Sequence, residues 1–392
     1  MVSKGALSVL FSVVFLDNLG FAIVVPYLYF FVSSLGGSAF LYGVLLASYS
    51  LLSFLFTPIV ARLSDRYGRR KILLIALAVS GFSYFLFGTA QALWLLFLGR
   101  MLAGTTAATV PVAQAYVADV TTQKERLRYL GLLGAAAGVA FILGPAIGGT
   151  LSNYFGYGVP SFLASALAFT NLVSAYFLLP EPSHFNIDPK KTIVSFAALR
   201  DVLRNQEIKL LLSVYFLFFV AFVFLQAALS PWLQAVFGFG PLQVGIVFFF
   251  LGGVSVFTQA ILLPQLSKKF SGLNLTIIGI LFLMLGLLGL AFAETLVLMF
   301  AVAAVISFGF GVQIVTFNTL ISLNAPKEAQ GGTLGIAWAF AALAQTVAPV
   351  LAASAFAFGV STGFEGLAFV ISAFISAATI PLVLSFRKIA QK

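Results

Sequence analysis

The sequence predicts an all-α polytopic membrane protein with twelve transmembrane helices arranged as two bundles of six. Hydrophobic residues make up 61% of the 392-residue chain and charged residues only 8%, whereas a soluble domain carries roughly 25% charged residues. The chain contains twelve apolar runs, each long enough to cross the ~30 Å hydrocarbon core of a bilayer. Patterns in the first half also return about 203 residues later, which predicts two related halves.

The runs fall into two groups of six, separated by the polar stretch Glu181–Lys209. We therefore expect an N-terminal bundle over residues 1–180, a cytoplasmic linker over 181–207 and a C-terminal bundle over 208–392. Within the linker, Ile193–Leu203 spaces its apolar residues at helical intervals, which predicts a short amphipathic helix on the inner membrane face. The predicted spans are Ala6–Phe31, Leu41–Ala61, Ile72–Ala90, Trp94–Ala118, Tyr129–Leu151, Val159–Leu179, Ile208–Val236, Pro241–Leu266, Leu273–Ala293, Leu296–Leu323, Gly331–Ala357 and Gly366–Phe386.

The distribution of cations predicts the topology. If both termini are cytoplasmic, the inner segments hold 20 of the 21 Lys and Arg residues, and outer connections such as VSSLGGSAF hold none. This bias predicts a multi-pass protein of the cytoplasmic membrane with both termini inside. The net charge of +10 thus serves orientation, so we expect no nucleic-acid partner. The chain has no Cys, which excludes disulfides and thiolate metal sites. We expect no metal or organic cofactor, and a monomer surrounded by lipid.

The repeat links the two halves position by position. L-S-D-R-Y-G at residues 63–68 recurs as L-S-K-K-F-S at residues 266–271, and Pro145 has a partner at Pro349. Two repeated bundles predict a substrate site at their interface. The second copy carries Lys268 where the first carries Asp65. We therefore expect the charged gate to belong to the first half.

Asp17 is an acid near the middle of the first span, in LDNLGFAIVVP, about 11 residues from its inner end. At 1.5 Å per residue it lies ~16 Å deep, beyond the reach of any loop. Its carboxyl must therefore be protonated, paired or exposed to a wet cavity. A proton-coupling group has these properties, and a permanently ion-paired structural Asp is the alternative.

Arg100 is the only cation inside a span, in FLGRMLAGT of the fourth run. Its side chain either reaches outward to water or takes part in a buried, cavity-facing site. Asp17 is the only intramembrane acid able to balance it. Together, Asp17 and Arg100 are the candidate proton-coupling residues.

The loop PIVARLSDRYGRRK, residues 58–71, joins the second and third runs. Its charges cannot enter hydrocarbon and must lie at one membrane face; on charge alone it is a topology anchor. L-S-D-R-Y-G-R-R also resembles the signature loop of the major facilitator superfamily, with Ala61 replacing the leading Gly. This resemblance implies the major facilitator fold and transport by alternating access, in which a cytoplasmic gate closes the outward-open state. The gate residues it implies are Asp65, Arg66, Gly68, Arg69, Arg70, Asp119 and Arg128.

In that family, the Asp ending the fourth helix pairs with an Arg of the loop, which implies a bridge from Asp119 to Arg69 or Arg70. Asp65 would then approach the N-terminus of the eleventh span near Gln330. A solvated charge cluster is the alternative. The first helix also resembles the signature of twelve-helix drug:proton antiporters, D-x-x-G-x-x-x-x-x-P. Here Asp17, Gly20 and Pro26 carry it.

The fifth span reads G-V-A-F-I-L-G-P-A-I-G-G from Gly138 to Gly149, and G-P-x-x-G-G resembles the motif of exporters. Its residues are Gly144, Pro145, Gly148 and Gly149, with Ala140 in place of one expected Gly. The glycines let helices approach closely. This motif favours efflux over uptake. The wider resemblance is greatest to the tetracycline-efflux branch, for example in YVADVTTQKERLRYLG, but Val254 and Leu283 stand where that branch carries its drug-recognising His and Asp. We therefore do not expect tetracycline as the substrate.

Polar and aromatic residues inside other spans are candidates for the cavity lining, although membrane amides also bridge helices. These candidates are Asn18, Tyr49, Gln114, Gln226, Trp232, Gln259, Gln313, Asn318, Trp338 and Gln345. We predict a proton-driven exporter of a hydrophobic or weakly cationic small molecule, not an enzyme. The alternatives are a metabolite importer or uniporter, and a lipid flippase or scramblase.

Overall fold

The computed structural model describes residues 4–181, 205–325 and 330–390. Within these ranges, twelve helices are long and apolar enough to cross a membrane, which confirms the predicted fold class and number of spans. The chain divides into two compact units: an N-terminal unit of residues 1–190 with 239–249, and a C-terminal unit of residues 191–238 with 250–392. The amphipathic helix predicted at Ile193–Leu203 lies outside the described residues. The orientation of the termini stays a prediction.

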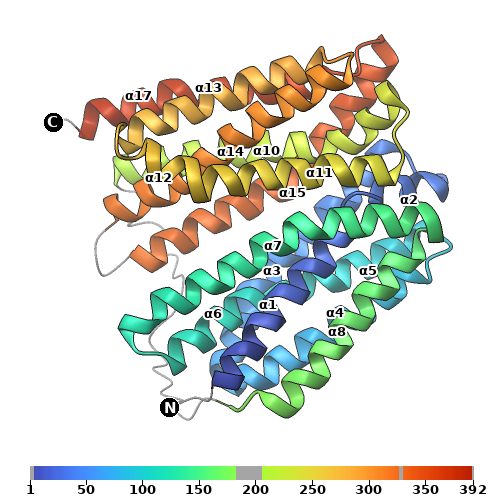
Figure 1. Ribbon diagram of the computed structural model, residues 1–392, viewed down its shortest axis with the longest axis vertical. Helices are drawn as coiled ribbons and strands as arrows, with labels where there is room; N and C mark the ends of the chain where they lie inside the picture. Colours follow the sequence, from blue (N-terminus) through green and yellow to red (C-terminus); the bar gives the residue numbers. More distant parts are fainter. Residues whose placement is uncertain (1–3, 182–204, 326–329, 391–392) are drawn as a thin grey trace. The chain divides into compact units, whose positions relative to one another are not determined.

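The helices of the N-terminal unit pack lengthwise against one another (Figure 1). Helix α1 packs mainly against α7 and α8, α4 packs against α8 and α5, and α3 packs against α5. Their bounds are α1 (Lys4–Val24), α2 (Leu28–Ser34), α3 (Ala39–Tyr67), α4 (Arg69–Gly88), α5 (Leu93–Thr105), α6 (Thr109–Val120), α7 (Gln123–Phe155) and α8 (Gly158–Leu178).

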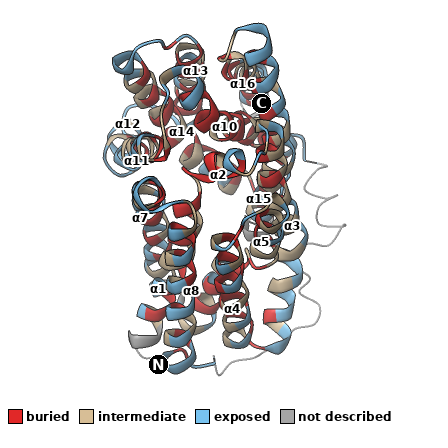
Figure 2. Cartoon of the chain, turned by 90° about the vertical axis from the view of Figure 1, so that its right-hand side faces the viewer, coloured by how far each residue is buried: buried red, intermediate tan, exposed pale blue. Residues whose placement is uncertain are grey.

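The helices of the C-terminal unit surround α10, whose side chains are largely buried (Figure 2). Helix α11 begins in the N-terminal unit and ends in the C-terminal one. The bounds are α10 (Gln206–Phe237), α11 (Pro241–Phe257), the π-helical turn η1 (Thr258–Leu262), α12 (Leu263–Leu266), α13 (Gly272–Ala291), α14 (Leu296–Asn324), α15 (Gln330–Thr362), α16 (Leu367–Ala377) and α17 (Thr379–Ala390).

Prolines interrupt three spans that the sequence predicts as continuous. The first run breaks between α1 and α2, around Pro26. The fourth breaks between α5 and α6, where Pro111 cannot donate a backbone hydrogen bond to Ala107, four residues earlier. The last breaks between α16 and α17, where Pro381 has the same effect on Ala377. The corrected spans therefore contain bends at fixed positions along the helix.

Two apolar clusters form the core of the N-terminal unit. One contains Val9, Leu10, Val13 and Val14 from the first half of α1. The other begins at Leu19 on the same helix. Asp17 lies between these two stretches of α1. The N-terminal unit therefore has a polar layer, which contains Asp17, between two apolar clusters. This layer positions the candidate site.

Candidate functional site

Asp17, Gly20 and Phe21 lie on one face of α1, since residues three and four apart are neighbours on a helix. A Cβ added to Gly20 would lie 3.1 Å from the ring of Tyr84 on α4 and 3.3 Å from its hydroxyl oxygen. The glycine therefore gives the Tyr84 side chain room to pack directly against α1. This explains the Asp-x-x-Gly spacing: the Gly admits a phenol one turn away from the acid.

Arg100 projects from α5 into a cage of aromatic rings and is only 3% exposed. Its guanidinium carbon lies 5.0 Å from the centroid of the Phe21 ring and 4.5 Å from that of Tyr49 on α3. Contacts of this kind contribute about 2 kcal/mol when desolvated. The Arg100 Nε atom is buried without a hydrogen-bond partner. The side chain therefore does not reach outward to water, and it contacts the turn of α1 that follows Asp17.

Asp17 and Arg100 do not form an ion pair: among the described residues, the two ion pairs present are both formed by Arg69, at the start of α4. Two phenols are close enough to both groups to influence them electrostatically. Tyr49 and Tyr84 each lie within electrostatic range of both charged groups. Sequence reasoning missed Tyr84, because a lone Tyr in an apolar run carries no signal until the groove at Gly20 is known.

The end of α3 and the start of α4 are held by ion pairs around Arg69. Its guanidinium contacts the Asp65 carboxylate at 2.5 Å and, through Nε, the Asp119 carboxylate of α6 at 3.0 Å. It also donates to the Ser64 hydroxyl at 2.7 Å. Of the two bridges implied by the resemblance, the structure therefore shows the one from Asp119 to Arg69. A contact of Asp65 with the start of α15 would join the two units and stays a prediction.

Arg70 has a different role, and its partner is an acid that the sequence did not single out. Its backbone N–H donates to the Glu181 carboxylate at 3.3 Å, and its side chain donates to the Tyr176 carbonyl at 2.6 Å. A Cβ at Gly68, where φ is +107°, would lie 2.9 Å from the same carboxylate. Gly68 is thus required both for the turn and for the approach of Glu181. The remaining predicted gate residues, Arg66 and Arg128, are exposed.

The glycines of α7 are needed where this helix crosses α1. A Cβ at Gly144 would overlap Ala22, and one at Gly148 would overlap the carbonyl oxygen of Ile23. A Cβ at Gly149 would lie 2.5 Å from the carbonyl oxygen of Pro241 in the first turn of α11. The G-P-x-x-G-G pattern is therefore a packing surface on which two other helices rest.

The candidate cavity residues separate into two groups. Trp232 is 1% exposed and packs edge-on against Phe369, and Gln313 is 1% exposed and donates to the Gly279 carbonyl at 3.0 Å. Both side chains pack between helices of the C-terminal unit, and their place in the cavity lining stays a prediction. Trp338, in contrast, is 52% exposed. The others are partly buried or exposed: Asn18, Tyr49, Gln114, Gln226, Gln259, Asn318 and Gln345.

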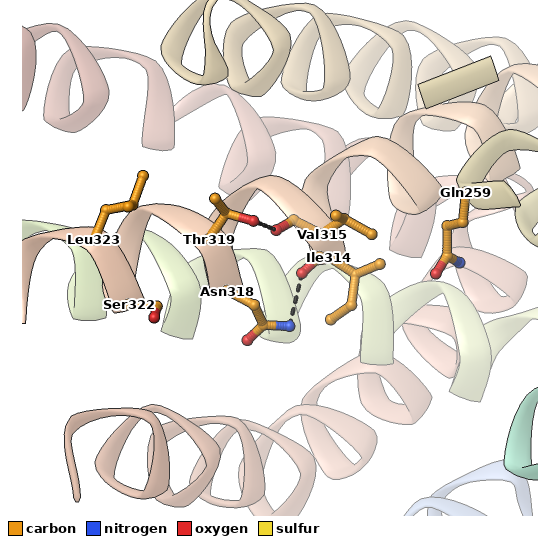
Figure 3. Close-up of a pocket in the computed structure, with 7 residues that line it drawn as sticks. All are labelled: Gln259, Ile314, Val315, Asn318, Thr319, Ser322 and Leu323. Atoms are coloured by element: carbon orange, nitrogen blue, oxygen red, sulfur yellow. Dashed lines mark hydrogen bonds between the residues drawn. The ribbon is translucent and has the colours of Figure 1, made fainter. Parts of the chain in front are cut away.

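Gln259 and Asn318 meet at a pocket of about 460 Å³ within the C-terminal unit (Figure 3). Gln259 comes from the π-helical turn η1, and the other lining residues come from the last three turns of α14. The lining consists of Gln259, Ile314, Val315, Asn318, Thr319, Ser322 and Leu323.

The protein has twelve membrane helices in two compact units, and one unit contains the charged residues Asp17 and Arg100 inside its spans. This combination is typical of secondary transporters. The Major Facilitator Superfamily profile matches residues 10–349, and the chain belongs to this family. It is a multi-pass membrane transporter and not an enzyme.

Named relatives are drug-resistance transporters. The chain is 30% identical to "Tetracycline resistance protein, class C" of Escherichia coli over 387 residues, 97% of each chain. It is 28% identical to "Multidrug resistance protein 2" of Bacillus subtilis over 272 residues, which cover 67% of this chain and 66% of that one. A bacterial homologue of the human lysosomal transporter Spinster has the same fold, with a TM-score of 0.84, 15% identity and 98% of both chains covered.

Proposed function

We propose that this transporter exports hydrophobic small molecules in exchange for protons by alternating access, with the proton gradient as its energy source and without another cofactor. The observation that carries the proposal is the placement of Asp17, inside α1, between two apolar clusters and in no ion pair with any residue that the structure describes. A membrane carboxyl without a fixed cationic partner is free to take up and release a proton.

The surroundings of Asp17 support coupling to transport. Arg100 contacts Phe21, one helical turn from Asp17, and is therefore placed to sense the charge on this face of α1. Tyr49 and Tyr84 each lie within electrostatic range of both charges, and the Tyr49 ring also contacts the Arg100 guanidinium. Protonation of Asp17 would change the field at Arg100 and at the helices that carry it, α1 and α5.

Export, rather than uptake, is favoured by two independent observations. The exporter-type glycines of α7 form a close-packed crossing with α1 just before the break at Pro26. The relatives named for tetracycline and multidrug resistance cover most of the chain. The ion pairs at Arg69 are the proposed latch of the cytoplasmic gate.

The test is proton movement in liposomes that contain the purified protein, with ethidium as the substrate. We expect ethidium-driven proton flux for the wild type and flux no greater than that of protein-free liposomes for Asp17→Asn, with ethidium binding retained. Ser12→Ala on the same helix is the matched control, since it removes only a bond to the Ser8 carbonyl.

Equal flux in wild type and Asp17→Asn would remove Asp17 from the mechanism. Transport that ignores a pH gradient, or that runs inward, would instead identify a uniporter or an importer. Wild-type protein that moves fluorescent lipid between leaflets without moving ethidium would identify a scramblase.

A further inference from the structure

Arg100 is a buried cation whose hydrogen-bonding groups have no partner among the described residues. The residue is 3% exposed, and its Nε is buried without a hydrogen bond. Its guanidinium lies over the rings of Phe21 and Tyr49 and contacts no carboxylate that the structure describes. Ring faces offset only part of the cost of burying an unpaired cation, and they accept none of its five N–H groups in the way that an anion does. The group that matches Arg100 is therefore a negatively charged acceptor.

Two phenol hydroxyls converge on the turn of α1 that Arg100 contacts. The Tyr84 hydroxyl oxygen lies 3.3 Å from the position of a Cβ at Gly20. The Tyr49 ring lies against Phe21, with 5.2 Å between the ring centroids. Neither hydroxyl is hydrogen-bonded to another residue that the structure describes. A guanidinium and two O–H donors thus come together from α5, α3 and α4, three helices that pack against one another.

This donor set favours a small anion with a single charge. The other groups within electrostatic range of Arg100 are the phenols of Tyr27 and Tyr42, which are neutral, and the Tyr27 hydroxyl is already shared with Ser161 at 2.6 Å. One negative charge neutralises one guanidinium, whereas a divalent anion would leave an excess charge in the membrane interior. Chloride is spherical and accepts hydrogen bonds from any direction, which suits donors that arrive from three helices.

Asp17 links this site to the proton. It lies one turn before Gly20 and Phe21 on α1, within electrostatic range of both Tyr49 and Tyr84. When Asp17 is ionised, its charge balances that of Arg100 in the polar layer. When Asp17 is protonated, the positive charge stands alone and an anion restores neutrality. Protonation and anion binding therefore favour each other, and the coupling between them is reciprocal.

No other charge on the surrounding helices lies at this depth among the described residues. The phenols stay neutral between pH 5 and pH 8. The described charged groups all lie within two turns of a helix end: Arg62, Asp65 and Arg66 on α3, Arg69, Arg70 and Lys71 on α4, Asp119 on α6, and Glu125, Arg126 and Arg128 on α7. A pH dependence of anion binding is thus assigned to Asp17.

We propose that Arg100, Tyr49 and Tyr84 bind one chloride ion, which is the counter-ion of Arg100 while Asp17 is protonated. This rests on the proposed proton exchange at Asp17. The anion and the proton are bound together and released together, so the polar layer holds no unbalanced charge in either state. Chloride thereby stabilises the proton-loaded form of the transporter.

The first test is chloride binding to the purified full-length protein, measured from the line width of the chloride NMR signal in gluconate buffer of constant ionic strength. Wild-type affinity should be about 5- to 150-fold higher at pH 5.5 than at pH 8, the usual range for coupled sites. Asp17→Asn should bind at pH 8 as tightly as the wild type does at pH 5.5. Tyr49→Phe and Tyr84→Phe should each weaken binding about tenfold or more, since each loses one hydrogen bond to a charged group.

The second test is proton uptake when sodium chloride is added to weakly buffered protein at pH 7, with sodium gluconate as the blank. The wild type should take up protons, and Asp17→Asn and Arg100→Met should take up none. Tyr154→Phe is the matched control in both tests, because it removes a phenol hydroxyl from a 66% exposed position on α7. Its chloride affinity and its proton uptake should equal those of the wild type.

Equal chloride binding in the wild type and Arg100→Met overturns the proposal, and so does wild-type binding without pH dependence and without proton uptake. A much higher affinity for benzoate than for chloride also overturns it, because Arg100 would then serve organic anions. Ethidium-driven proton flux is measured on the same preparations. Flux without chloride binding rejects only the anion site, and chloride binding without flux rejects only the exchange.

Discussion

The two units differ in the kinds of side chain that lie inside their spans. In the N-terminal unit, Asp17 and Arg100 stand in the middle of their helices, and the repeat places Val220 and Ala303 at the corresponding positions of the C-terminal unit. Around α10, that unit has stacked aromatic rings instead, such as Phe222 on Phe310 at 4.1 Å between centroids. Among the described residues, the charges in the middle of the spans thus belong to the N-terminal unit, and the corresponding positions of the C-terminal unit are apolar.

The two units also differ in how closely helices pack at the crossings made by α7 and α15. At an offset of 204 residues, Ala348, Ala352 and Ala353 correspond to Gly144, Gly148 and Gly149. These alanines are fully buried, so the crossing of α15 accommodates methyl groups. The crossing of α7 does not, because the α1 backbone occupies the space. The two halves thus differ in how closely their helices approach at this crossing.

The largest difference is expected between removal of the buried charge of the N-terminal unit and removal of a buried amide of the C-terminal unit. Arg100→Met should reduce proton-coupled ethidium transport to background, because no other described side chain places a cation against α1. Its thermal stability should be unchanged or higher, since a desolvated charge is removed. Gln313→Met, which loses the bond to the Gly279 carbonyl, should cost about 0.5–1.5 kcal/mol and retain transport. Transport at the wild-type rate in Arg100→Met would contradict the proposed role of Arg100 in proton coupling.

The second comparison concerns the helix crossings. Gly148→Ala should destabilise the protein by about 1–3 kcal/mol, because its methyl group would force the Ile23 carbonyl to move. The reverse change at the corresponding position, Ala352→Gly, should cost about 1 kcal/mol. Gly138→Ala on α7 is the control, since its Cβ would meet nothing within 4 Å. Thermal unfolding in detergent measures all three, and equal midpoints for Gly148→Ala and Gly138→Ala would show that α1 and α7 are not in close contact.

A smaller effect is expected at the ion pairs formed by Arg69. Asp119→Asn removes one partner of Arg69 but leaves Asp65 in place. Since partly exposed pairs contribute about 0–1 kcal/mol, we expect little loss of stability and a transport rate lowered by less than tenfold. Lys268→Asp, at the corresponding position of the other unit, should leave the rate unchanged. A complete loss of transport in Asp119→Asn would indicate a role beyond that of a latch.

The smallest effect is expected at Glu181, which accepts the Arg70 backbone N–H at the start of α4. Glu181→Gln retains an acceptor oxygen and loses only the charge at the helix N-terminus, which contributes about 0.3–1 kcal/mol. We expect a small decrease in the unfolding midpoint that disappears at high salt, because salt screens exposed charges. A decrease that persists in 1 M salt would point to lost packing instead.

Some features of the fold and of the candidate site could be predicted from the sequence, and others could not. The twelve spans could be predicted from runs of apolar residues, because each helix must be long enough to cross the bilayer. The sequence also indicated several candidate site residues, because charges and glycines are easily recognised in an apolar chain. They include Asp17, Arg69, Asp119 and the α7 glycines. Polarity alone does not tell which face of a span meets a neighbouring helix, so the sequence did not indicate that Trp232 and Gln313 are buried between helices of the C-terminal unit.

The sequence by itself therefore determined the membrane fold, the family and the level at which the charges lie, since each depends on composition along the chain. Only the tertiary structure decided which side chains meet. It put Tyr84 into the groove at Gly20, Glu181 against Gly68, and Gln259 across from Asn318. These contacts join residues far apart in the chain, and they depend on helix rotation and proline breaks that no local pattern specifies.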